Sequence, residues 1–80
     1  MNVLMPKWGV SMQEATLVEW LVQEGADVGV GDALALIETD KVSTELTSEV
    51  AGVLVEHVVA ENTVVQVGDI VAVIRETVTS

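Results

Sequence analysis

Two stretches of the chain are near copies of each other and decide the fold: "LVEWLVQEGADVGVGDALALI" from Leu17 to Ile37, and "LVEHVVAENTVVQVGDIVAVI" from Leu54 to Ile74. They agree at about half of their positions, with a constant offset of 37 residues. Self-similarity over this length indicates that one supersecondary unit occurs twice. Because a solenoid generally needs roughly three or more units, two copies predict a sandwich with an internal pseudo-twofold axis.

Each copy consists of short strands separated by turns. The stretch from Ala15 to Val22 is rich in β-formers, and "VGD" punctuates both copies before another apolar strand. Gly25 and Asn62 occupy the same repeat position, and both residue types tolerate positive φ, which predicts a turn there. An amphipathic helix over 16–23 is disfavoured, because the segment is valine-rich and has no convincing cap. The sequence therefore predicts an all-β fold.

The composition suits two closely packed sheets. With 80 residues the chain forms one domain, and a chain of this size has a small core. Half of the residues are apolar, mostly Val, Leu, Ile and Ala, and the aromatic residues are Trp8 and Trp20. A thin aliphatic core of this kind favours sheet-on-sheet packing over a large helical interior.

The charge limits the classes of partner. A formal net charge of −10 argues against nucleic acid and anionic membranes, which need Lys and Arg, and favours partners with basic surfaces. The chain has no cysteine, so disulfides, thiolate nucleophiles and cysteine-ligated metals are excluded. No apolar run approaches membrane-spanning length, and no signal peptide is evident, so we expect a soluble intracellular domain.

A single lysine stands at the junction of the two copies. In "IETDKVSTEL", from Ile37 to Leu46, Lys41 lies among Glu38, Asp40 and Glu45, and the chain has only one other lysine, Lys7. If a pseudo-dyad exchanges the copies, this junction lies at the pole opposite the chain termini. An ordinary solvated lysine in a hairpin turn is the simpler interpretation. The position at the unique junction favours a functional role.

With these motifs, the sequence resembles the lipoyl domain of the acyltransferase (E2) component of 2-oxo acid dehydrogenase complexes, in the biotinyl/lipoyl attachment family. The similarity covers nearly the whole chain, from the opening "MPKWGVSMQEATLVEWLVQEGADV" to "IETDKVSTEL". It implies a flattened barrel or sandwich of two four-stranded antiparallel sheets, a barrel-sandwich hybrid, with Lys41 at an exposed β-turn. We expect residues 1–76 to form the domain and residues 77–80 to be a tail or the start of a linker.

The resemblance implies a carrier function without catalytic residues. A lipoate ligase or lipoyl transferase would join lipoic acid to Lys41 as an amide. This swinging arm would move acyl groups and electrons between a thiamin-dependent decarboxylase (E1), the acyltransferase core (E2) and a dihydrolipoamide dehydrogenase (E3). A monomeric domain in the bacterial cytoplasm or the mitochondrial matrix is expected. The resemblance leaves open which 2-oxo acid or acetoin system is served, and whether the chain stands alone or belongs to a longer one.

Several neighbours have both a structural and a functional interpretation. Glu38, Asp40 and Val42 flank the lysine and either form the turn or are recognised by the modifying enzyme. The segment Trp8, Gly9, Val10 and Ser11 is either a surface loop or, as in the resembling family, the loop by which the decarboxylase selects its carrier. Gly25 and Gly52 match family glycines on either side of the lysine, and we expect both in turns.

Three other functions are less well supported. A biotin carrier usually has methionines on both sides of its lysine, where this chain has Asp40 and Val42. An unmodified assembly module of the same hammerhead-like shape would make no use of Lys41. An enzyme would need a nucleophile–base pair, a metal cluster or a phosphate loop. His57, the only histidine, is expected to be a satisfied strand residue and not a metal ligand, and Trp20 at the matching repeat position is expected to be packing.

Overall fold

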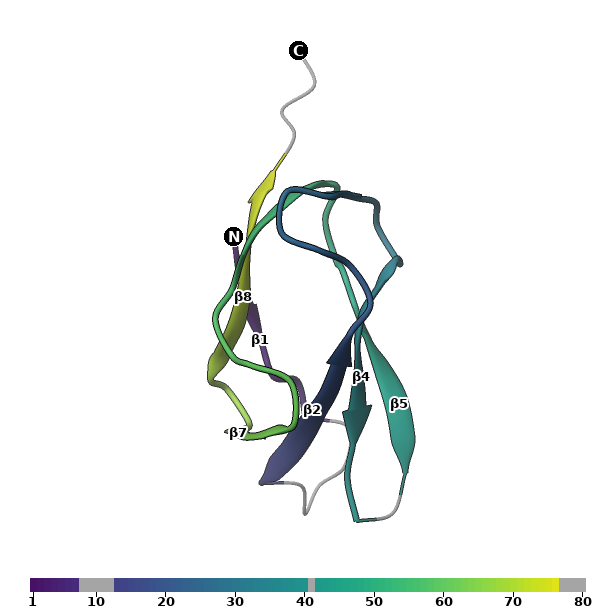
Figure 1. Ribbon diagram of the computed structural model, residues 1–80, viewed down its shortest axis with the longest axis vertical. Coiled ribbons are helices and arrows are strands. Elements are labelled where there is room, and N and C mark those ends of the chain that lie inside the picture. The colour runs from purple at the N-terminus through teal and green to yellow at the C-terminus, as the bar shows by residue number, and fades with distance from the viewer. Residues whose placement is uncertain (8–12, 41, 77–80) are drawn as a thin grey trace.

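A computed structural model describes residues 1–7, 13–40 and 42–76, and these residues form strands and turns without a helix (Figure 1). The strands are β1 (Asn2–Leu4), β2 (Glu14–Trp20), β3 (Asp27–Val28), β4 (Ala33–Glu38), β5 (Ser43–Thr47), β6 (Gly52–His57), β7 (Thr63–Gln66) and β8 (Ile70–Glu76). Within these described ranges, nothing helical is long and apolar enough to traverse a bilayer. The predicted all-β class is confirmed.

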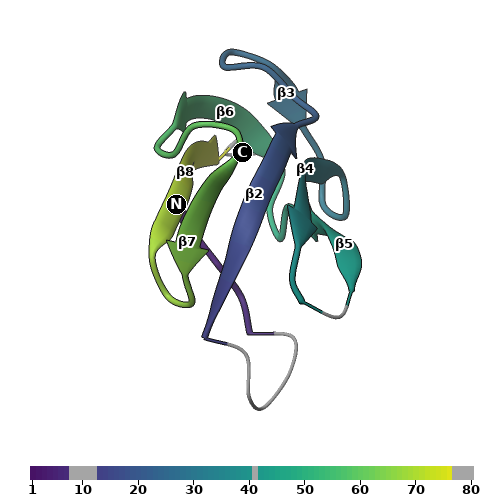
Figure 2. The ribbon, with the colours of Figure 1, turned by 60° about the horizontal axis from the view of Figure 1, so that its bottom comes forward.

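The strands form two four-stranded antiparallel sheets, in the orders β1-β8-β6-β3 and β5-β4-β2-β7 (Figure 2). The two orders correspond strand by strand: β1 with β5, β8 with β4, β6 with β2 and β3 with β7. The members of each pair are four strands apart in the sequence. This is the signature of a pseudo-twofold axis that exchanges the two copies. Each sheet takes two strands from each half of the chain, so neither half can complete a sheet by itself.

The β-bulges repeat with the same symmetry. Val18 is the extra residue of β2 against β4, and Val55 is the extra residue of β6 against β8. Leu34 in β4 and Val71 in β8 form the second equivalent pair. A bulge bends its strand and increases the local twist. Bulges at matching places in both sheets therefore curve them toward each other into a flattened barrel.

Among the described residues, ten of the fourteen buried apolar residues of the core form pairs at equivalent repeat positions. The largest fully buried side chains include Leu17 and its counterpart Leu54, and Ile37 and its counterpart Ile74. The remaining equivalent core pairs are Val28 with Val65, Leu34 with Val71 and Ala35 with Ala72. Every pair contributes one side chain from each sheet, as expected for two inner faces that interdigitate. The thin aliphatic core predicted from composition is thus built twice from one pattern.

The predicted turn at equivalent positions is confirmed. Gly25 has φ of 90° and Asn62 has φ of 62°. The Gly25 N–H donates to the Leu54 carbonyl at 2.6 Å, and the Asn62 N–H donates to the Leu17 carbonyl at 2.6 Å. Each copy therefore uses its left-handed turn to bind the long strand of the other copy.

The expectation of a turn at Gly52 is wrong, because Gly52 is the first residue of β6. A Cβ atom at this position would lie 2.2 Å from the backbone oxygen of Arg75 in β8. Glycine is needed here because β6 and β8 approach each other too closely for any side chain, and not because the chain reverses.

Replacing Gly25 by alanine should destabilise the fold, because an L-residue pays about 1–2 kcal/mol in the left-handed region and nothing near the new Cβ compensates for that cost. Gly29→Ala is the matched control. Gly29 lacks a positive φ, and its new Cβ would make only an ordinary contact, 3.5 Å from Asp32 Oδ2. Urea unfolding measures both variants. Equal midpoints for the two variants would contradict this account of the turn.

Candidate functional site

The junction between the two copies is a hairpin of β4 and β5. Glu38 pairs with Ser43 as the last pair of the ladder, and the Thr39 N–H then donates to the Val42 carbonyl at 2.8 Å. Only two residues, Asp40 and Lys41, remain between these ends. Lys41 itself lies outside the described residues, but the residues bonded to it are both exposed, and 53% of Val42 is accessible. The predicted attachment position is therefore flanked in the chain by two exposed residues, Asp40 and Val42.

The hairpin and the chain ends lie at different ends of the molecule. In Figure 1 the β4–β5 hairpin is at the bottom, whereas the N label and the end of β8 are in the upper half. The Met1 ammonium donates a hydrogen bond to the Ile74 carbonyl and so holds β1 beside β8. This is the arrangement that the pseudo-dyad predicts, and it keeps the hairpin clear of the points where further chain would attach.

The surface at the hairpin is acidic. Glu38 and Asp40 are exposed, and with Glu14 they line a shallow hollow of about 260 Å³ beside the turn, whose other lining residues are Ala15, Thr16, Thr39 and Val64. Glu45 is exposed farther along β5. Carboxylates gathered on one rim attract basic surfaces and repel acidic ones. The sequence placed Glu38, Asp40 and Glu45 around the lysine, but it did not identify Glu14, which comes from β2.

The segment predicted to select the decarboxylase, comprising Trp8, Gly9, Val10 and Ser11, lies outside the described residues. The residues that follow it, from Gln13 onward, are described. Gln13 accepts a hydrogen bond from the Val67 N–H at 2.9 Å, and the next residue, Glu14, lines the same hollow as Asp40. The chain that leaves this segment therefore enters β2 next to the attachment turn.

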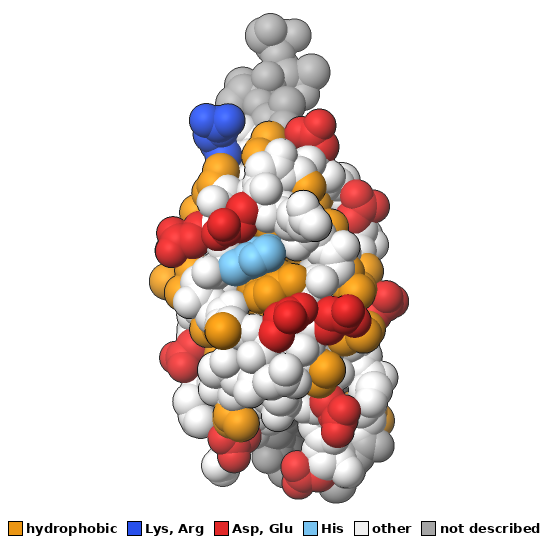
Figure 3. All heavy atoms as spheres, viewed as in Figure 1, with side chains coloured by type: hydrophobic (Ala, Val, Ile, Leu, Met, Phe, Trp, Pro, Cys, Tyr) orange, Lys and Arg blue, Asp and Glu red, His pale blue; other side chains and the backbone are white. Residues whose placement is uncertain are grey.

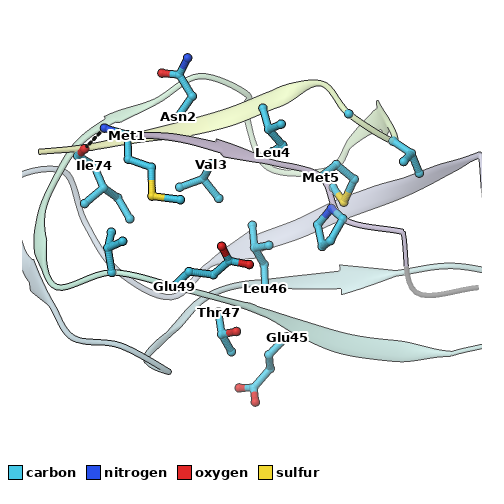
Figure 4. A pocket seen from close by; sticks show the side chains of 14 residues that line it. Met1, Asn2, Val3, Leu4, Met5, Glu45, Leu46, Thr47, Glu49 and Ile74 are labelled. Carbon is cyan, nitrogen blue, oxygen red and sulfur yellow. Dashed lines mark hydrogen bonds between the residues drawn. The ribbon is translucent and has the colours of Figure 1, made fainter. Parts of the chain in front are cut away.

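A larger hollow of about 480 Å³ lies on the flank of the molecule, between the edge strands β1 and β5 (Figure 4). Val3 and Leu46 form apolar walls, the Glu49 carboxylate turns toward Leu46, and Glu45 turns away. The described recognition residues Glu38, Asp40 and Val42 do not line it. This hollow marks the open side of the sandwich and is separate from the tip.

Trp20 and His57, which occupy equivalent repeat positions, stack on each other. Their ring centroids are 4.1 Å apart and the rings are 8° from parallel. In Figure 3 the pale blue histidine lies against an orange side chain, with red acidic groups on both sides. The prediction that Trp20 is packing is confirmed, since it is half-buried against the core. The sequence did not indicate that two equivalent residues would meet each other at the pseudo-dyad.

The hydrogen bonds around this stack obey the same symmetry. The Trp20 Nε1–H donates to the Val59 carbonyl at 2.9 Å, and His57 Nε2 bonds the Val22 carbonyl at 2.9 Å. Since a carbonyl only accepts, His57 carries a proton on Nε2. The backbone N–H groups of Trp20 and His57 donate to Glu61 and Glu24 at 2.9 and 2.8 Å. His57 is thus the satisfied strand residue that was predicted.

Among residues 1–7, 13–40 and 42–76, no three His, Asp, Glu or Cys side chains come together in an arrangement that could hold a metal ion.

The family model described as biotin-requiring enzyme matches residues 1–74. A succinyltransferase component of a 2-oxoglutarate dehydrogenase complex from Staphylococcus saprophyticus is 45% identical over 94% of the chain, and an acetyltransferase component of an acetoin cleaving system from Pseudomonas putida is 40% identical over 94%. The chain spans only 18% and 20% of these relatives. The solution structure of the lipoyl domain of the Azotobacter vinelandii 2-oxoglutarate dehydrogenase complex matches with a TM-score of 0.76 and 29% identity, covering 95% of this chain and 96% of that one.

Replacing His57 by alanine should lower the free energy of unfolding by about 1–2 kcal/mol, because the stack with Trp20 and the bond to the Val22 carbonyl are both lost. His57→Phe keeps a ring for stacking but has no N–H donor, so its stability should lie between that of wild type and that of the alanine variant. Thermal and urea unfolding measure the series. A phenylalanine variant no more stable than the alanine variant would show that stacking contributes nothing.

Proposed function

The chain belongs to the family described as biotin-requiring enzyme and is a lipoyl domain of the kind found in the acyltransferase components of 2-oxo acid and acetoin dehydrogenase complexes, and from this premise we propose that Lys41 carries lipoic acid. The observation that carries the proposal is the tight β4–β5 hairpin, closed by Thr39 and Val42, whose two-residue loop contains the lysine.

The described residues fit such a group. An arm of this kind must reach active sites of other proteins, so its point of attachment has to project from the surface. Asp40 and Val42 are exposed, and the hollow beside them is shallow, so nothing described encloses the loop. Residue by residue, Lys41 supplies the amine, and Glu38, Asp40 and Val42 present it to the modifying enzyme.

Attachment forms one amide bond. An ATP-dependent lipoate ligase would join the carboxyl group of lipoic acid to the Lys41 amine, with ATP cleaved to AMP and pyrophosphate and the displaced carboxylate oxygen leaving on AMP. The product is a stable amide on a flexible stem, with an extended reach of roughly 10–14 Å from bond lengths. When bound, the dithiolane supplies the sulfur chemistry that takes up acyl groups and electrons. The domain supplies position and reach.

The partners follow from this role. We infer that the carrier serves a thiamin-dependent decarboxylase, an acyltransferase core and a dihydrolipoamide dehydrogenase, because relatives of this chain are acyltransferase components of such complexes. Tethering would hold the arm near each active site at roughly millimolar effective concentration. The acidic rim of Glu14, Glu38 and Asp40 favours partner active-site entrances with basic surfaces.

Incubation with lipoate ligase, lipoate and ATP should modify Lys41 alone. Lys41→Arg should abolish the mass increase, since arginine keeps the charge but offers no amine for this amide. Lys7→Arg, the matched control at the only other lysine of the sequence, should be modified as wild type is. Intact-mass and fragment spectra locate the group. Modification on a peptide containing Lys7, or biotin incorporation by a biotin ligase in place of lipoate, would refute the assignment.

The lipoylated domain should be a much better substrate than free lipoamide for one class of decarboxylase. Presentation on a folded carrier contributes docking contacts that free lipoamide lacks, so we expect kcat/KM to rise by roughly a thousandfold or more for the cognate enzyme, the factor for about 4 kcal/mol of contact energy. A panel of purified pyruvate, 2-oxoglutarate, branched-chain and acetoin decarboxylases identifies that class. If no enzyme prefers the domain to free lipoamide, the carrier role is wrong.

A further inference from the structure

Thr39 ties the two ends of the attachment loop together through three hydrogen bonds. Its backbone N–H donates to the Val42 carbonyl at 2.8 Å. Its hydroxyl group donates to the same carbonyl at 3.2 Å, and its Oγ1 accepts from the Val42 N–H at 3.2 Å. Thr39 therefore binds both backbone polar groups of Val42, and the side chain takes part in two of the three bonds.

One hydroxyl group can make both side-chain bonds, because it has one proton to donate and lone pairs to accept with. The bond from the Val42 N–H matters most for the loop. In an antiparallel pair of this type the two residues normally exchange backbone bonds. Here the Thr39 hydroxyl accepts the hydrogen bond from the Val42 N–H. It therefore fixes the residue that directly precedes β5. Valine, which has nearly the same shape, would keep the packing of Thr39 but not this bond.

We propose that Thr39 is the positioning residue of the attachment loop: its hydroxyl fixes the backbone on both sides of position 41 and thereby raises the rate at which Lys41 is modified. The inference rests on the proposed function, since it concerns the same lysine. A modifying enzyme must bring the amine to within about 3–3.5 Å of the acyl carbon in a suitable direction. If the loop populates the competent arrangement only part of the time, apparent affinity for the enzyme falls in proportion.

The location of Thr39 agrees with a positioning role. Thr39 is half-buried, whereas Asp40, which lines the same shallow hollow, is exposed. The neighbouring pairs on the side away from the loop, Glu38 with Ser43 and Ile37 with Thr44, belong to the regular ladder. Thr39 directly follows β4, so it stands between the last ladder pair, Glu38 with Ser43, and the loop.

The test compares Thr39→Val, Thr39→Ser and the matched control Thr47→Val, which makes the same chemical change at an exposed site on β5. Initial rates of lipoylation at subsaturating domain concentration are followed by intact mass. Thr39→Val removes both side-chain hydrogen bonds, so we expect kcat/KM to fall by about tenfold or more, whereas it should stay within about twofold of wild type in Thr39→Ser. Thr47→Val should match wild type.

Amide hydrogen exchange of unmodified protein provides a second readout that does not depend on any enzyme. Exchange at the Val42 N–H should be about tenfold faster in Thr39→Val than in wild type or Thr39→Ser, whereas exchange at Ile37 in β4 should be unchanged. Far-UV circular dichroism and melting temperatures confirm that each variant is folded. A merely structural role for Thr39 would alter the melting temperature and leave the lipoylation rate of folded protein untouched.

The outcomes separate the two proposals. If wild type is lipoylated and Thr39→Val is lipoylated equally fast, the positioning role is overturned and the carrier function stands. If Thr39→Ser loses as much rate as Thr39→Val, the methyl group and not the hydroxyl is responsible, which also overturns the inference. If wild type takes up no lipoyl group, the proposed function fails and the inference fails with it.

Discussion

The rest of the structure depends on the reciprocal hydrogen bonding of the two copies across the pseudo-dyad. Gly25 binds the Leu54 carbonyl while Asn62 binds the Leu17 carbonyl, and the Trp20 and His57 rings each bond the turn that follows the other. Because each copy satisfies backbone groups of its partner, a half-chain would lose these hydrogen bonds, each of which contributes about 0.5–1.5 kcal/mol. The two copies therefore fold as one unit, although the chain is short.

The attachment hairpin is a direct consequence of this interlocking. β4 ends the first copy and β5 begins the second, and the two strands are neighbours in one sheet. The equivalent neighbours in the other sheet are β8 and β1, which are joined by no loop because they are the last and first strands of the domain. The symmetry thus yields two similar poles, of which only one has a loop. A lysine placed in that loop is separated from the chain ends without any added element.

The repeat made much of the fold predictable, because equivalent positions constrain each other. Gly25 and Asn62 are different residues that both tolerate positive φ, so their alignment indicated a turn. Both residues have positive φ in the structure. The error at Gly52 shows where the constraint was not used. Its equivalent is Ala15, a buried residue in β2, and extending the alignment by two positions would have placed Gly52 in a strand.

The missed features of the site depend on contacts that the sequence does not encode locally. Thr39 is an ordinary residue of a strand end until the loop geometry brings its hydroxyl to Val42. Glu14 joins the acidic rim only because β2 lies beside β4. The stack of Trp20 on His57 follows from symmetry, since residues next to a twofold axis contact their own equivalents, but the location of the axis had to come from the fold.

The acidity of the hairpin gives the proposed modification an electrostatic consequence. Before modification, the carboxylates of the rim would attract the Lys41 ammonium. Amide formation removes that charge, as acetylation does, and the attraction disappears with it. An uncharged arm would offer no charge for the rim to attract, while Glu14, Glu38 and Asp40 would still attract a basic partner surface. On the proposed function, loss of the lysine charge would therefore free the arm without any change in the carboxylates that attract a basic partner.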